Sequence, residues 1–169
     1  MVAERKMDAT HLLAEDHRKV EGLFEQFEKA GGDGRKEKIA NQICTELKIH
    51  SMIEEEIFYP ALRGKIDDAD LDEAYVEHDG AKVLINEIEA GGPDEEFYDA
   101  KVKVLQEQIE HHVEEEEKIR NNIFQQARAS DVDLEALGRQ MEERKAELMQ
   151  LAATEGLPPA QTATMTSEG

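Results

Sequence analysis

The sequence contains one cysteine, no tryptophan, four prolines and only 20 basic side chains among its 169 residues. The single cysteine, Cys44, excludes an intramolecular disulfide and any metal site built from cysteines alone. No apolar run approaches the roughly 18 residues that a membrane-spanning helix requires. The N-terminal segment has no continuous apolar stretch of the kind that a secretion signal carries. We therefore expect a cytoplasmic protein with no membrane partner.

Negative charge dominates the composition, with 40 acidic residues and a formal net charge of −20. A surface of this sign gains no counterion release from nucleic acid and is repelled by anionic membranes. We therefore expect no nucleic-acid partner. A homodimer or an unidentified protein partner is left open by the composition. The length is that of one domain.

Helix-forming residues fill the chain between short clusters of glycine and proline, and no stretch keeps the alternation typical of a strand. Apolar residues recur at spacings of three and four, which predicts helices over 9–30, 35–63, 68–90, 94–128 and 131–152. Short loops between long helices favour an all-α fold. We expect an antiparallel up-down four-helix bundle over residues 8–128, with an additional C-terminal helix at 131–152. Residues 153–169 have little to bury, and we expect a disordered tail there.

The chain also repeats itself. Residues 15–32 align with residues 76–92 at an offset of 61, which places His17 over His78. Residues 47–56 align with 109–118 at an offset of 62. The second alignment places His50 over His112 and Glu54 over Glu116. Each half therefore supplies one helix with a lone histidine and one helix with His-x-x-x-Glu, and pairing the halves would bring all six groups to a pseudo-twofold axis.

The His-x-x-x-Glu spacing alone is a weak signal, because glutamate is so frequent that a surface ion pair on a helix explains any single instance. Agreement with the apolar stripe is more informative. The stripes run 13, 17, 20, 24, 27 on the first helix, 39, 43, 47, 50, 54, 57 on the second, and 105, 109, 112, 116, 119, 123 on the fourth. They direct all six groups at the core, His78 lying seven residues before Ile85. The residues that fall off the stripes are expected to be solvated: His11, His111, Glu55, Glu56, Glu114, Glu115 and Glu117.

Buried carboxylates cost several kcal/mol each unless something compensates their charge. Protonated carboxyls hydrogen-bonded to histidines would satisfy such a core, and a pair of bound cations would do so more completely. The cations would neutralise both carboxylates and use the imidazole lone pairs. We therefore predict a metal site whose ligands are His17, His50, Glu54, His78, His112 and Glu116.

The segments EDHRKVEGLF, HSMIEEEIFYP, VEHDGAKVLI and HHVEEEEKIRNNIF together resemble the hemerythrin-like HHE cation-binding domain over residues 8–128. The resemblance implies two iron ions with an oxygen bridge in the bundle core. It further implies that the four histidines are terminal ligands and that Glu54 and Glu116 bridge the irons. Nitrogen and oxygen ligands also suit manganese or zinc.

The match to the oxygen carrier of this family is incomplete, because Lys82 stands where the carrier has a fifth histidine. The set of four histidines and two glutamates resembles members linked to peroxide chemistry, to iron or oxygen sensing and to iron-centre repair. Our leading hypothesis is a protein that binds or reduces O₂, peroxide or NO, with catalase- or oxidase-like activity and a link to oxidative stress. The alternatives are a sensor that signals to a protein partner, a repair protein, and a metal-free helical interaction protein. Glu21 or Tyr75 as a further ligand is left open.

Overall fold

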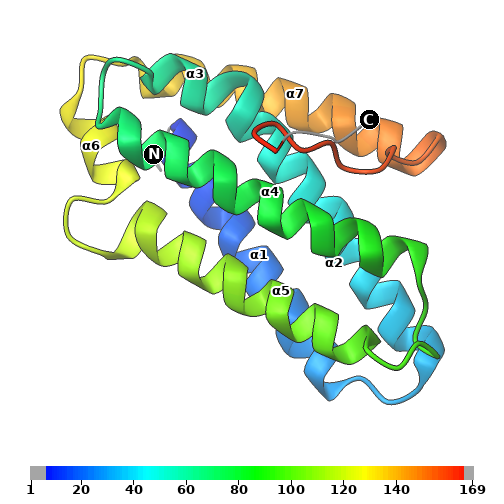
Figure 1. Ribbon diagram of the computed structural model, residues 1–169. Helices are drawn as coiled ribbons and strands as arrows, with labels where there is room; N and C mark the ends of the chain where they lie inside the picture. The colour runs from blue at the N-terminus through cyan, green and yellow to red at the C-terminus, as the bar shows by residue number, and fades with distance from the viewer. Residues whose placement is uncertain (1–6, 166–169) are drawn as a thin grey trace, which may run out of the picture.

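The computed structural model describes residues 7–165, and within that range it contains helices and no strand (Figure 1). Four long helices form the bundle: α1 (Ala9–Lys29), α2 (Asp33–Ile53), α4 (Asp68–Ala90) and α5 (Tyr98–Val113). Shorter or peripheral elements complete it: the π-helical turns η1 (Glu54–Phe58) and η2 (Glu114–Lys118), α3 (Tyr59–Leu62), α6 (Ile123–Ala129) and α7 (Leu134–Thr154).

The helices pair in chain order, α1 with α2 and α4 with α5, and α2 also packs on α4. Helix α7 lies outside the bundle across α1 and α2 (Figure 1). The expected all-α fold, an antiparallel bundle with one additional C-terminal helix, is confirmed. No helix in residues 7–165 combines the length and the apolar character needed to cross a membrane.

The two helices that carry His-x-x-x-Glu, α2 and α5, each continue into a π-helical turn at the predicted site. The turn changes which residues face the core. The backbone N–H of Tyr59 donates to the carbonyl of Glu54, and that of Ile119 donates to Glu114, each five residues earlier. Such a turn contains one residue more than an α-helical turn. The stripe expected to continue at Ile57 therefore continues at Phe58, which is fully buried. Ile119, also expected in the core, is 48% exposed.

The predicted fourth helix, 94–128, is wrong at its start and in its continuity, whereas its predicted end lies within one residue of Ala129. It begins only at Tyr98, and it is interrupted between η2 and α6. Asn121 adopts a φ of 60°, which a helix cannot accommodate, and the Asn122 side chain accepts a hydrogen bond from the Gln125 N–H at 2.9 Å to start α6. This break turns the chain back over the bundle, so that the ring of Phe124 stacks on that of His17 with centroids 6.0 Å apart.

The core consists of two apolar clusters. One, at the end formed by α3 and α6, includes Leu13, Ile53, Phe58 and Phe124. The other, towards the opposite end, includes Phe24, Ile43, Leu47, Ile85 and Leu105. The six predicted metal ligands lie on the helices between these clusters, so the bundle has one buried polar layer enclosed by apolar ones.

Residues 155–165 of the expected disordered tail run beside α4 without regular secondary structure (Figure 1). The Asp79 carboxylate accepts hydrogen bonds from the backbone N–H groups of Ala163, Thr164 and Met165, and Asn86 exchanges two hydrogen bonds with Ala160. Composition alone does not predict these contacts. Residues 166–169, also part of the expected tail, lie outside the described residues.

We predict that Gly138→Ala destabilises the protein, because Gly138 is the point where α7 approaches the start of α1. A β-carbon there would lie 2.9 Å from the backbone oxygen of Met7 and 3.0 Å from the nitrogen of Ala9. We expect a loss of about 1–3 kcal/mol in the free energy of unfolding, measured by urea denaturation.

Gly22→Ala is the matched control, because Gly22 lies inside α1 and nothing stands within 4 Å of the position that its β-carbon would take. Alanine there should stabilise the helix by about 0.5–1 kcal/mol. Equal effects of the two substitutions would show that α7 is not packed as described.

Candidate metal centre

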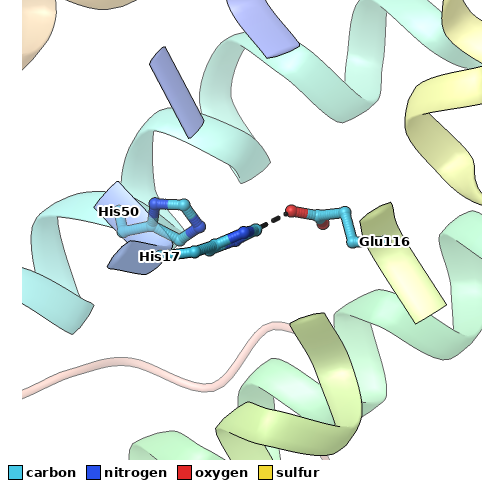
Figure 2. A group of neighbouring side chains, drawn as sticks. All are labelled: His17, His50 and Glu116. Atoms are coloured by element: carbon cyan, nitrogen blue, oxygen red, sulfur yellow. Dashed lines mark ion pairs between the residues drawn. The ribbon is translucent and has the colours of Figure 1, made fainter. Parts of the chain in front are cut away.

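All six predicted ligands are buried, with exposures between 0 and 7%. The structure brings their side chains together in two groups of three, and within each group one ligand atom per residue lies within 4.8 Å of the others. The first group is His17, His50 and Glu116, shown in Figure 2. The second group is Glu54, His78 and His112.

The two carboxylates connect the two groups. Oε1 of Glu54 lies 2.8 Å from Nε2 of His50 and 3.3 Å from Nε2 of His78. Oε1 of Glu116 lies 3.2 Å from Nε2 of His17, and its Oε2 lies 3.2 Å from Nε2 of His112. Each carboxylate therefore contacts one histidine of each group, which is the placement required of a carboxylate that bridges two ions.

A second carboxylate faces the outer nitrogen of each histidine. Nδ1 of His50 lies 3.1 Å from Asp16, and Nδ1 of His78 lies 2.9 Å from Glu55. The corresponding distances are 3.5 Å from His112 to Glu77 and 3.6 Å from His17 to Glu117. A carboxylate in this position favours a proton on Nδ1, orients the ring and leaves the Nε2 lone pair free for a metal.

These outer carboxylates follow the internal repeat. Asp16 and Glu77 directly precede His17 and His78, while Glu55 and Glu117 directly follow Glu54 and Glu116. The expectation that Glu55 and Glu117 are solvated is wrong, since their side chains are only 15% and 11% exposed. Their adjacency to ligands at the same offset in both halves was the available signal. His11 and His111 are exposed, as the stripes predict.

Tyr59 is a further residue of the site that the sequence reasoning missed. Its hydroxyl donates to Oε2 of Glu116 at 2.6 Å and lies 3.3 Å from Nε2 of His112 and 3.5 Å from Nε2 of His78. Burial, together with the negative charges of Glu116 and Glu54, raises the pKa of Tyr59 well above its ordinary value. The hydroxyl is therefore protonated at neutral pH.

Neither of the two extra ligands left open by the sequence reaches the centre. The hydroxyl of Tyr75 lies 3.5 Å from the backbone oxygen of Glu55. Glu21 is 36% exposed and pairs with Arg18 at 3.2 Å. Lys82 is buried, but its ammonium donates to Glu55 at 2.9 Å and lies 3.4 Å from Asp79, so it forms part of the surrounding charge network.

The charged groups of the site lie in ion-pair contact with one another. Although burial opposes it, the attraction of Glu54 and the hydrogen bond to Asp16 raise the pKa of His50 to about 10. Against the same opposition from burial, Glu116 raises the pKa of His112, and His112 in turn lowers the pKa of Glu116 well below its usual range. Protons therefore favour His50 and His112 over the carboxylates that face them, whereas burial lowers the pKa of His17.

The site nevertheless leaves buried polar atoms without hydrogen bonds. Among the described residues seven buried side-chain atoms lack a hydrogen bond, and only one of them, the Tyr98 hydroxyl, lies outside this centre. The others belong to the six ligands: both ring nitrogens of His17, Nε2 of His50, both oxygens of Glu54 and Oε1 of Glu116. Nitrogen and oxygen atoms without hydrogen-bond partners at these positions are of the types that bind cations.

A helical bundle with a buried His/Glu centre defines a class of metal-binding protein, and the comparisons with known proteins specify it. The family model of the hemerythrin HHE cation-binding domain matches residues 8–122. The chain belongs to this family.

A solved structure with a similar fold is that of a hemerythrin HHE cation-binding domain-containing protein from Mycobacterium kansasii, a homologue of Rv2633c. The TM-score is 0.74 at 23% identity, covering 89% of this chain and 95% of the other. A DNA nickase from Nostoc sp. is 29% identical over 125 residues, which are 71% of this chain. The match spans only 36% of the nickase, so it concerns one part of that protein.

We predict that Glu55→Gln weakens metal binding without removing a ligand. The glutamine keeps the shape of the side chain but loses the charge that orients His78. We expect metal affinity to fall about 10–100-fold, measured by competition with a chromophoric chelator.

The neighbouring Glu56→Gln is the matched control, since Glu56 is exposed and pairs with Arg144 at 2.9 Å. It should leave the affinity unchanged. A Glu55→Gln protein that binds metal as tightly as the Glu56→Gln protein would contradict the role given to Glu55.

Proposed function

We propose that the six residues hold two iron ions and that the protein, in the cytoplasm, binds or reduces a small molecule such as O₂, peroxide or NO. One observation carries the proposal: two groups of three ligands are joined by two carboxylates, each in contact with both groups. In this assignment His17 and His50 hold one ion, and His78 and His112 hold the other. Glu54 and Glu116 bridge them.

The iron pair would supply the electrons exchanged with the bound molecule, and the chain supplies orientation, a dry environment and protons. Outer carboxylates fix the histidine rings, and the apolar clusters exclude water from the layer. Tyr59 holds a proton on its hydroxyl beside His78 and His112. A proton at this position is suited to a leaving oxygen when an O–O bond breaks.

The donor set favours turnover over storage of O₂. With four histidines, pseudo-symmetry assigns two to each ion, which leaves room at both ions for an added molecule. Lys82, in the place of the carrier's fifth histidine, is held by Glu55 and cannot ligate. We therefore propose catalase- or oxidase-like activity.

A sensor is the second candidate, favoured by one contact of α7. Nζ of Lys145 lies 2.5 Å from Oδ1 of Asp16, whose Oδ2 holds His50 at 3.1 Å. A change at His50 would therefore reach α7 through a single carboxylate. The nicking of DNA belongs to the Nostoc relative, and a chain with a net charge of −20 has no electrostatic attraction to phosphates.

The proposal predicts two irons per chain, measured by elemental analysis of protein purified without added metal. Glu116→Ala should lose most of both ions, because this carboxylate contacts both groups. His112→Ala should retain at least the ion of the other group.

Chelation of the full chain should lower its melting temperature, since metal bound only by the native state stabilises it.

His111→Ala is the control for these variants, because the His111 side chain is 63% exposed and lies outside both groups of the predicted centre. It should keep both ions. Circular dichroism establishes that each variant is folded. Full iron content in a folded Glu116→Ala protein would refute the bridging assignment.

We further predict that the reduced, iron-loaded protein is oxidised irreversibly by O₂ and converts two molecules of hydrogen peroxide into O₂ and two of water. Tyr59→Phe should slow peroxide turnover by at least about tenfold, because the proton on the hydroxyl is lost. Tyr75→Phe should have no such effect. Oxygen evolution measures the turnover of peroxide, and stopped-flow absorbance measures the oxidation of the reduced protein by O₂.

A spectrum that returns to that of the reduced protein when O₂ is withdrawn under vacuum would instead indicate reversible carriage. Fast peroxide turnover separates the enzyme from the sensor, which would respond once per molecule with a change in the exposure of α7.

A further inference from the structure

A small cavity lies directly against the histidines of the centre. Its volume is about 30 Å³, room for roughly two water-sized molecules. Its lining includes four ligands of the predicted centre: His17, His50, His78 and His112. Apolar side chains form most of the rest: Val20, Leu47, Ala81, Ile85, Ile109 and Val113. We call this space the inner chamber.

A larger cavity of about 310 Å³ lies between α2 and the C-terminal segment. Met52 and Glu56 line it from the bundle side, and residues 157–161 line it from the other. Ser51 and Lys82 belong to the walls of both cavities. These two residues therefore stand between the outer cavity and the inner chamber, and both are largely buried, at 8% and 6% exposure.

Hydrogen bonds attach the C-terminal segment to both α2 and α4. On α2, Lys48 donates to the carbonyl of Pro158 at 3.0 Å. On α4, Asn86 donates to the carbonyl of Ala160 at 2.9 Å and accepts from its N–H at 2.8 Å. Further along, the Asp79 carboxylate accepts from the backbone of Ala163 and Thr164 and from the Thr164 hydroxyl.

We propose that residues 157–165 form a strap over the entrance to the metal centre, and that Ser51 and Lys82 form its threshold. Together they restrict entry to small neutral molecules. The inference rests on the proposed function, because it concerns what reaches the two ions.

The selectivity follows from size and from charge. A chamber of about 30 Å³ has room for O₂, NO or hydrogen peroxide. An alkyl peroxide with a branched carbon group is larger, so the strap has to open before such a molecule can approach the threshold. The largely apolar wall of the chamber offers an ion little to replace its lost hydration. Lys82 does not attract anions at the threshold, because Glu55 at 2.9 Å and Asp79 at 3.4 Å already compensate its charge.

The test compares two oxidants of different size on the reduced, iron-loaded full chain. Hydrogen peroxide and tert-butyl hydroperoxide each accept two electrons from the iron pair and two protons, and the O–O bond breaks. Hydrogen peroxide then yields two molecules of water, and tert-butyl hydroperoxide yields one of water and one of tert-butyl alcohol. The second-order rate constant of tert-butyl hydroperoxide divided by that of hydrogen peroxide measures how freely a large molecule reaches the metal centre. A chain ending at Gly156 should raise this ratio at least about tenfold, since no segment has to open before the larger molecule enters.

Two single substitutions keep the test decisive if the shortened chain folds poorly. Asn86→Ala loosens the strap and should raise the ratio, whereas Asn41→Ala, an exposed asparagine of α2, should not. Ser51→Leu narrows the threshold and should slow both oxidants. An unchanged ratio in a folded Asn86→Ala protein with full iron content would overturn the strap.

Hydrogen exchange supplies a readout that needs neither iron nor activity. The N–H groups of Ala160, Ala163 and Thr164 should exchange slowly in the full chain and quickly in Asn86→Ala. If the full chain holds no metal, the proposed function fails, and these amides alone decide the position of the strap. Exchange of all three at the rate of an unstructured peptide would refute it.

Discussion

Two carboxylates buried in the middle of a helical bundle are the constraint on which the rest of the structure depends. Glu54 and Glu116 are completely shielded from solvent and would repel each other across the core. An isolated buried charge costs several kcal/mol, so each carboxylate needs partners of opposite charge within reach. Four histidines provide nitrogen atoms at about 3 Å, and the raised pKa values of His50 and His112 favour a compensating proton on each. A bundle that satisfies this layer with protons is also prepared to exchange those protons for cations.

The surroundings of the centre follow from the same constraint. A histidine that faces a carboxylate with one nitrogen needs a partner for the other. Asp16, Glu55 and Glu77 accept hydrogen bonds there, and Glu117 places a negative charge 3.6 Å from Nδ1 of His17. Each π-helical turn contains one of the two buried carboxylates: η1 begins at Glu54, and η2, which begins at Glu114, includes Glu116. A wider turn shifts the residues that follow by one position, which brings Tyr59 into the polar layer and leaves Ile119 outside it. The apolar clusters on both sides then isolate the layer from water.

The fold and the convergence of the six side chains were predictable because both depend on periodicity. The repeat that aligns His17 with His78 and Glu54 with Glu116 is visible in the sequence itself and does not depend on tertiary contacts. The role of these residues as ligands stays a prediction. The π-helical turns were not predictable, because the residues EEEIF and EEEEK are compatible with an ordinary α-helix and the wider turn depends on tertiary contacts. The end of η2 at Lys118 and the contacts of Asp79 with the C-terminal segment depend on tertiary packing in the same way.

The repeat is most informative where it fails. The position equivalent to Tyr59, 62 residues later, is Asn121, which has a positive φ and stands in the break between η2 and α6. The second half of the chain therefore cannot place a phenol at the centre, and its break instead allows Phe124 to cover His17. One group of ligands faces a hydroxyl that holds a proton, and the other faces an apolar ring. The histidines of the two groups therefore differ in their surroundings, because Tyr59 holds a proton beside His78 and His112 whereas an apolar ring covers His17.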